Sequence, residues 1–218
     1  MKMGLKMAEK RIIPLFPLPL VVCPEETLPL HIFEERYKAM IAYCRKERQP
    51  FGVSLAYNNK LYSVGCTVEL EEIVNEYPDG RLDIITVGVM RYRMLETYKD
   101  KPYLRAAVEF FDDDGEPVDP TLRQRVITLH LKFIELLQGE TTVEDYDFHE
   151  RVSFRVAHSA GFDVLQKQKV LEMTNENKRL EMLIEHFEKI IPDIERTEEI
   201  KRRVRSNGHF KNLRSFDL

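Results

Sequence analysis

The chain has 218 residues, of which 43% are hydrophobic and 32% are charged, as in a soluble folded protein of one or two domains. Thirty-three Lys and Arg residues against 37 Asp and Glu residues give a net charge of −4, which argues against a general nucleic-acid binder. Three cysteines without a CxxC pair indicate neither a disulfide scaffold nor a structural zinc site. No run approaches the roughly 20 apolar residues that cross a bilayer.

Residues 1–10 have the composition of a flexible leader. The apolar run 12–23 follows this basic start, as in an export signal. However, three prolines interrupt the run, and a lipoprotein-type cleavage site needs a small residue where Val22 precedes Cys23. We therefore expect a cytoplasmic protein with no membrane partner.

Residues 11–116 alternate short apolar runs with turn residues, which predicts a mainly β domain. Helical spacing of apolar residues from Glu34 to Arg45 predicts one helix within it. Asp79 and Gly80 predict a tight hairpin, because this pair tolerates the positive φ that such turns require. Strands are expected at 51–55, 67–77, 81–89, 90–95 and 104–111.

After Gly115 the apolar period changes from two to 3.6 residues, which predicts a helical bundle over residues 117–192. Asp119 before a proline is typical of a helix start, and Gly139 of its end. Asp163, three residues before a glutamine, indicates a capping box. Helices are expected at 120–138, at 148–160, from 164 onward and at 180–191, with a helical continuation at 194–205.

Charge is unevenly distributed along the chain. Acidic residues crowd the linker 109–119, whereas Lys and Arg residues make 193–218 a basic tail, helical or disordered. Such a tail is usually a solvated end. The alternatives are that it docks on an acidic surface, including this linker, or contacts nucleic acid.

The sequence contains no recognisable catalytic motif. No glycine is followed by lysine, so the phosphate loop of an ATPase is missing, and there is no GxSxG nucleophile motif. The six histidines have no Cys or His partner at metal-ligand spacing. We therefore expect no enzymatic activity, no catalytic residue, no metal and no cofactor.

Several short motifs stand in a specific order along the β half. They are Pro14-Leu15-Phe16-Pro17-Leu18, the run Leu28 to Tyr37, Phe51-Gly52-Val53, Val64-Gly65-Cys66, Asp79-Gly80-Arg81, and Gly88 with Arg91-Tyr92-Arg93. Together with the helical segment 165–190, they strongly resemble the amino-terminal substrate-binding domain of Lon proteases, over residues 11–192.

The resemblance implies an α+β fold, in which a PUA-like β pseudo-barrel with one helix precedes a C-terminal helical bundle. It also implies a stand-alone, non-catalytic protein that lacks the ATPase and Ser/Lys protease modules of Lon. Its expected partners are unfolded or flexible protein segments, and it is expected to recognise them directly or as an adaptor for a protease or chaperone.

We place the candidate peptide-binding residues at the start of the helix in the β half: Phe33, Arg36 and Tyr37. The alternative is that both aromatic side chains belong to the core. RNA binding stays open because PUA-like barrels elsewhere bind RNA, although only the segment from Lys201 to Arg214 has the required charge. A small-ligand pocket is a third possibility, and the oligomeric state is not determined by the sequence.

Overall fold

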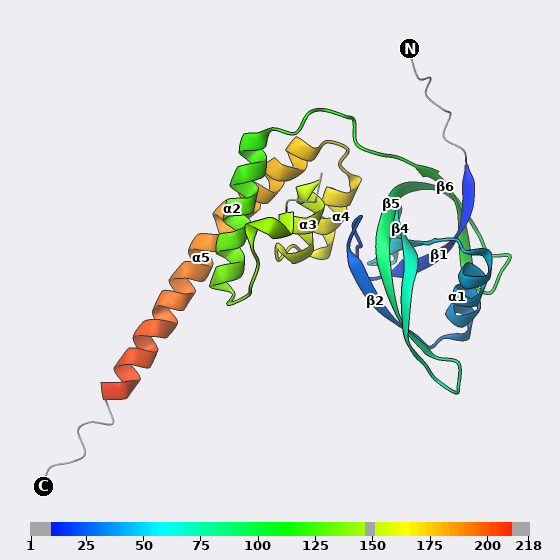
Figure 1. Cartoon of the computed structure of the whole chain (residues 1–218), viewed down its shortest axis with the longest axis horizontal. Helices are drawn as coiled ribbons and strands as arrows, with labels where there is room; N and C mark the ends of the chain where they lie inside the picture. Colours follow the sequence, from blue (N-terminus) through cyan, green and yellow to red (C-terminus); the bar gives the residue numbers. More distant parts are fainter. Residues whose placement is uncertain (1–9, 147–150, 211–218) are drawn as a thin grey trace, which may run out of the picture.

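A computed structural model of the chain describes residues 10–146 and 151–210, and the side chains of the last helix as far as Arg203. A β-sheet with one helix comes first, and a group of helices follows (Figure 1). The predicted mixed α+β class is therefore confirmed. Except for Lys10, the expected leader lies outside the described residues, and so does the end of the tail.

The elements follow one another in a simple order. The strands are β1 (Arg11–Leu18), β2 (Thr27–Ile32), β3 (Phe51–Tyr57), β4 (Lys60–Glu76), β5 (Leu82–Tyr98) and β6 (Leu104–Phe110). The helices are α1 (Glu35–Glu47), α2 (Pro120–Leu136), the 3₁₀ turn η1 (Val143–Tyr146), α3 (Val152–Ser159), α4 (Val164–Glu172) and α5 (Glu176–Phe210).

The sheet closes on itself. Its strand order is β2-β5-β4-β3-β1-β6, and β6 also pairs with β5, so that β2 alone lies outside the ring among the described strands. Strands β4 and β5 are 17 residues long, and the expected strands 81–89 and 90–95 are one continuous strand. Irregularities in the β4–β5 register bend these long strands, as β-bulges do. The predicted hairpin at Gly80 joins them, with the φ of Gly80 at 79°.

The glycine motifs of the β half make room for one buried tyrosine. Tyr92 on β5 is fully buried, and its hydroxyl group shares a hydrogen bond of 2.8 Å with the Ser54 hydroxyl group. A Cβ atom at Gly52 or Gly65 would come within 2.6 or 2.5 Å of the Tyr92 hydroxyl oxygen. These two positions therefore require glycine because the tyrosine ring occupies the space.

The proline-rich start of the chain forms strand β1, which the pattern analysis did not predict. Prolines are unfavourable in a strand with partners on both sides, because they cannot donate to the ladder. In β1, residues 11–15 pair with β6 and residues 15–18 pair with β3. Pro14 and Pro17 thus each lie where a partner is present on one side only.

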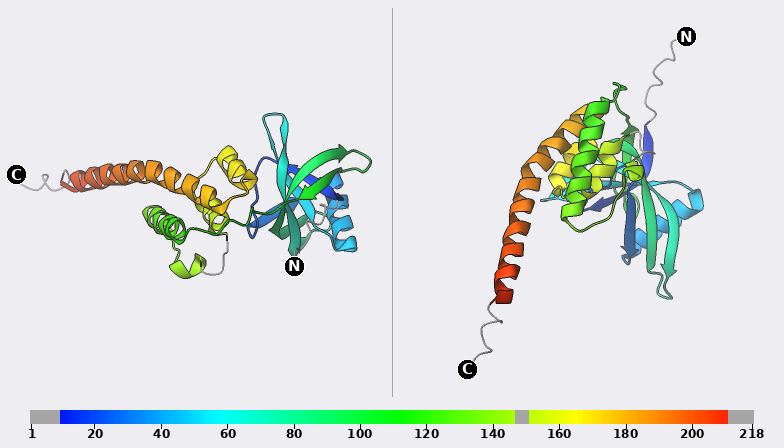
Figure 2. Two further views of the ribbon diagram at one scale, coloured as in Figure 1. Left: turned by 90° about the horizontal axis from the view of Figure 1, so that it is seen from above. Right: turned by 60° about the vertical axis from the view of Figure 1, so that its left-hand side comes forward.

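The helices gather beside the sheet, where α2, α3 and α5 enclose a second core (Figures 1 and 2). The buried Val170 and Leu171 of α4 instead belong to the core of the sheet. The predicted apolar stripe of α5 is confirmed as part of the second core, with Leu180, Leu183 and Phe187 fully buried. The capping box at Asp163 is also confirmed, because its side chain accepts hydrogen bonds from the backbone N–H groups of Leu165 and Gln166.

Three helix boundaries differ from the prediction. Helix α2 ends at Leu136, before Gly139, because Gln138 adopts the left-handed turn with a φ of 60°. Helix α3 begins at Val152, and residues 148–150 of the expected helix lie outside the described ranges. Helix α5 continues through Pro192 and projects away from the other helices (Figure 2).

Two buried arginines join the sheet to the helices. Arg91 on β5 and Arg179 on α5 are 2% and 0% exposed, and both donate hydrogen bonds to Asp113. Arg91 also donates to the carbonyl groups of Leu171 and Met173, at 3.2 and 2.6 Å. The linker carboxylate Asp113 is therefore part of the connection between the two halves.

The electrostatics of this junction reflect burial offset by pairing. Burial lowers the pKa of Arg91, although the Asp113 carboxylate opposes that shift. Burial alone would raise the pKa of Asp113, but the hydrogen bonds and charges of Arg179 and Arg91 outweigh it and hold the pKa below its usual value.

A second polar contact joins the β half to the helices. Glu26, just before β2, accepts a hydrogen bond from Lys167 on α4 at 2.6 Å and pairs with His158 on α3 at 2.9 Å.

Candidate functional site

The chemistry of the described residues does not point to a metal or redox centre. In that part of the chain, no group of three or more His, Cys, Asp and Glu side chains is placed to bind a metal ion, and no helix is both long and apolar enough to span a membrane. Burial raises the pKa of the Cys23 and Cys44 thiols to about 12, so both remain protonated.

The three expected peptide-binding residues at the start of α1 have different environments. Phe33 is 59% exposed and stacks on the His31 ring, with a centroid distance of 5.9 Å. Arg36 is also exposed, and its guanidinium group lies 4.5 Å from the centroid of the Tyr37 ring. Tyr37 is only 8% exposed and packs against Phe16 in the core. Phe33 and Arg36 can therefore contact a ligand, whereas Tyr37 supports Arg36 from below.

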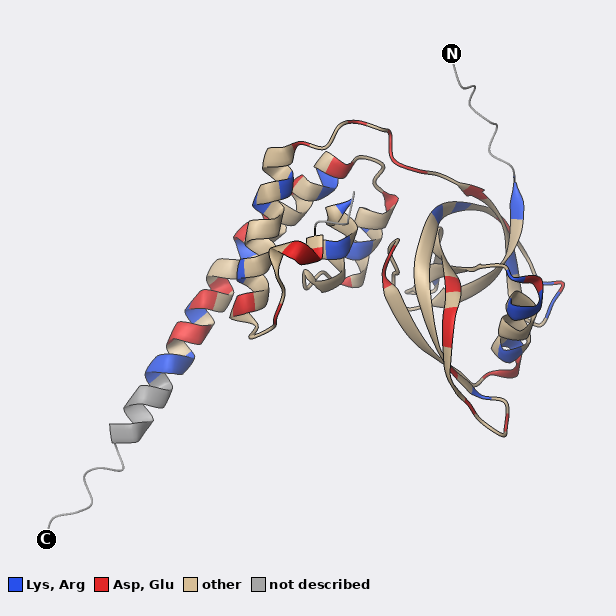
Figure 3. Ribbon diagram, in the orientation of Figure 1, with Lys and Arg blue, Asp and Glu red and all other residues tan. Residues whose placement is uncertain are grey.

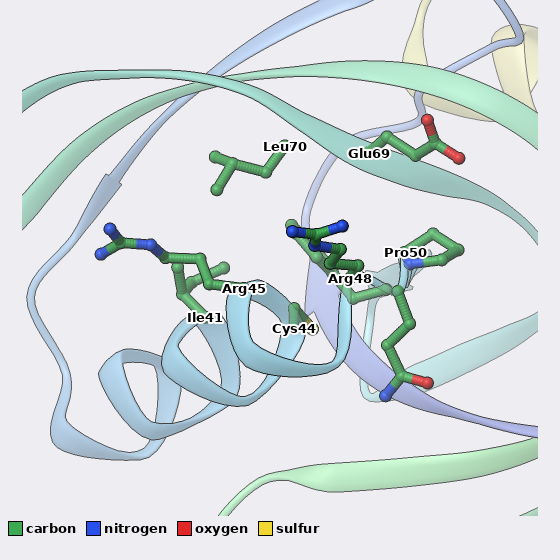
Figure 4. A pocket seen from close by; sticks show the side chains of 9 residues that line it. Ile41, Cys44, Arg45, Arg48, Pro50, Glu69 and Leu70 are labelled. Atoms are coloured by element: carbon green, nitrogen blue, oxygen red, sulfur yellow. The ribbon is translucent and has the colours of Figure 1, made fainter.

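A pocket of about 380 Å³ lies at the other end of the same helix (Figure 4). We call it the α1–β4 pocket, because its walls come from α1, from the connection to β3 and from β4. Its lining residues are Ile41, Cys44, Arg45, Arg48, Gln49, Pro50, Phe51, Glu69 and Leu70.

The local sequence explains why the pocket forms here. Helix α1 ends at Arg48, which adopts a left-handed conformation with a φ of 50° and donates its backbone N–H to the Cys44 carbonyl group. After this turn and Pro50 the chain enters the sheet, where β3 begins at Phe51, opposite Val68. No described strand pairs with β4 beyond that point on the side opposite β5.

The pocket combines an apolar floor with a charged rim. Ile41, Cys44 and Phe51 are buried below it, and Leu70 is half-buried. Arg45 and Arg48 stand on the helical side, and Glu69 lies across from them on β4 (Figure 4). Figure 3 shows the same contrast more broadly, with Lys and Arg gathered on α1 and acidic residues along β4. Such a pocket can accept an apolar side chain together with a polar group at its mouth.

The pattern analysis did not identify Arg45 and Arg48 as site residues. The available signal was the basic last turn of the helix followed by a proline, which also fits an ordinary helix end. Only the position of β4, distant in sequence, turns this helix end into the wall of a pocket.

The closed sheet with its following helices defines a mixed α+β class of domain. The family model of the ATP-dependent protease La (LON) substrate-binding domain matches residues 12–189. The chain therefore belongs to this family, as the order of its motifs predicted.

Two curated relatives of the chain are Lon proteases, and the chain matches a part of each. It is 23% identical to the Lon protease of Anaeromyxobacter dehalogenans over 80% of this chain and 22% of that protein. It is also 23% identical to the Lon protease of Escherichia coli K12, over 91% of this chain and 27% of that protein. The chain thus spans about a quarter of the length of these relatives.

Two solved structures show the same fold. A Lon N-terminal domain protein from Xanthomonas campestris aligns with a TM-score of 0.64 and 24% identity, covering 80% of this chain and 97% of that one. The N-terminal domain of the Mycobacterium avium complex Lon protease aligns with a TM-score of 0.59 and 15% identity, covering 82% of this chain and 99% of that one.

Proposed function

We propose that this chain recognises exposed, partly apolar segments of protein substrates, and that the α1–β4 pocket receives one of their apolar side chains. The observation that carries the proposal is the apolar floor of this pocket beside a stretch of β4 that has no described strand on the side opposite β5. Membership of a substrate-binding family supports it.

The geometry suits an extended chain. An unfolded segment has unpaired backbone groups and exposed apolar side chains. A strand edge can form hydrogen bonds with these backbone groups, and a pocket can receive the apolar side chains. Beyond Glu69, β4 has β5 on one side and no described strand on the other. Phe33 and Arg36, at the start of the same helix, offer a second exposed contact.

We further propose that the closed sheet, within residues 11–116, is a PUA-like barrel and that residues 117–192 form a helical bundle. The chain is then a non-catalytic recognition module, or an adaptor that presents segments to a protease or chaperone. An adaptor would raise the rate at which a Lon protease degrades an unfolded substrate, whereas simple binding would lower that rate by competing for the substrate.

RNA is the weaker alternative. Lys201 and Arg203 on α5 pair with Glu198 and Glu199, so the described part of the tail is not a separate basic surface. An RNA-binding tail predicts that deletion of residues 200–218 abolishes binding and that affinity falls steeply with salt. A peptide site predicts little effect of the same deletion.

An occluding substitution tests the proposal. Gln49→Trp places a large ring at the pocket, whereas Glu47→Trp adds the same ring at an exposed position that does not line it. We expect a neutral Leu-rich peptide to bind the parent chain and the Glu47→Trp variant in the micromolar range, and Gln49→Trp to weaken binding at least about tenfold. Fluorescence anisotropy measures the affinity. Absence of binding by the parent chain at ~100 μM would contradict the proposal.

A further inference from the structure

Building on the proposed function, we infer that the α1–β4 pocket selects segments in which an acidic residue lies next to the apolar residue that enters it. The ligand class is therefore an extended peptide with adjacent apolar and carboxylate side chains. The positions of Arg45 and Arg48 carry this inference.

These two arginines differ from the exposed arginines of the protein that form ion pairs. The guanidinium groups of Arg45 and Arg48 have no ion-pair or hydrogen-bond partner among the side chains that the structure describes, although both stand at the rim of an apolar pocket. The exposed arginines with acidic partners include Arg36, Arg81, Arg125 and Arg196.

The chemistry of a guanidinium group favours a carboxylate as its missing partner. Arginine presents planar donors that match both oxygens of a carboxylate, and such charge-assisted hydrogen bonds are stronger than neutral ones. The two arginines are three residues apart at the end of one helix, and both line the pocket (Figure 4).

Glu69 on the opposite wall restricts the arrangement. Its carboxylate repels an acidic group on the β4 side, whereas the arginines attract one on the α1 side. A bound segment therefore places its single acidic side chain toward α1, and a polyacidic segment gains less than its charge suggests. This asymmetry argues for a defined acidic position rather than for general attraction of negative charge.

The end of the helix allows both arginines to be removed without disturbing the fold. Alanine has the highest helix propensity and so suits position 45, and glycine adopts the left-handed conformation of position 48 without strain. Lys46→Ala serves as the matched control, because Lys46 lies in the same turn but does not line the pocket.

The experiment compares two labelled peptides with blocked ends that differ only in Glu or Gln beside a central Leu. We expect the parent chain and the Lys46→Ala variant to bind the Glu peptide about fivefold more tightly, with a smaller ratio at high salt. The Arg45→Ala/Arg48→Gly variant should bind both peptides equally, at the affinity of the parent chain for the Gln peptide.

The outcomes separate this inference from the proposed function. Equal affinity of the parent chain for the two peptides would overturn the acidic preference while leaving apolar recognition intact. Binding of neither peptide would overturn both. A preference that survives in the double variant would also contradict the role of the two arginines. A preference reversed by Arg45→Glu, toward a peptide with Lys in place of Glu, would support it.

Discussion

Two pairs of arginines, one at the junction between the sheet and the helices and one at the end of α1, have opposite environments. Arg91 and Arg179 are buried at the junction with the helices and donate to carboxylate and carbonyl groups. Arg45 and Arg48 are exposed at the α1–β4 pocket and have no acidic partner among the described side chains. The buried arginines are thus compensated by groups of the protein itself and connect its two parts, whereas the charges at the pocket rim have no such compensation among the described side chains.

The largest effect is expected at the buried pair. Arg179→Met removes the ion-pair partner of the buried Glu176 carboxylate and one of the two buried arginines that pair with Asp113. We expect the free energy of unfolding to fall by about 3–5 kcal/mol, measured by urea denaturation followed by circular dichroism. The control Arg125→Met breaks an exposed pair with Glu188 and should cost less than about 1 kcal/mol. Equal losses in the two variants would remove the distinction between buried and exposed arginines.

A buried histidine extends the comparison to the helical half. His130 contacts the hydroxyl groups of Tyr146 and Ser159, at 2.6 and 2.9 Å, and burial, assisted by the charge of Arg155, lowers its pKa to about 4. The folded protein thus disfavours protonation, whereas the unfolded chain takes up a proton near pH 6.5. The contribution of neutral His130 to the free energy of unfolding is therefore fully present above about pH 6.5. It declines as the pH falls toward about 4, by up to about 3 kcal/mol.

The His130→Gln variant tests this pH dependence. Urea denaturation near pH 7 and near pH 5 should show a smaller loss of stability for the variant than for the parent chain. Asp113 does not obscure the result, because its lowered pKa confines its own loss of stability to pH values below about 4. Parallel losses in the two proteins would contradict a neutral buried histidine.

The smallest effect is expected at the pocket rim. Arg48→Gly removes the strain of a left-handed arginine, so the variant should be as stable as the parent chain or about 1 kcal/mol more stable. Thermal unfolding measures the difference. A clear loss of stability would mean that the Arg48 side chain has a structural role, and it would weaken the contrast with Arg179.

The sequence by itself determined the features that depend on neighbouring residues. The hairpin at Gly80, the capping box at Asp163 and the apolar stripe of α5 follow from local backbone preferences and side-chain period, and all three are present. The ordered motifs also identified the family. Some of their residues are fixed by packing, since the buried Tyr92 ring leaves no room for a side chain at Gly52 or Gly65.

Only the tertiary structure decided the site and the junction. Phe33 is exposed and Tyr37 is buried, although both are aromatic. Phe33 precedes the helix, so the helical spacing of apolar residues does not predict which way its side chain points. Asp113 meets Arg179 across 66 positions of sequence, and the rim of the pocket joins α1 to β4. Such contacts depend on long-range strand pairing and packing, which no local pattern of charge or hydrophobicity specifies.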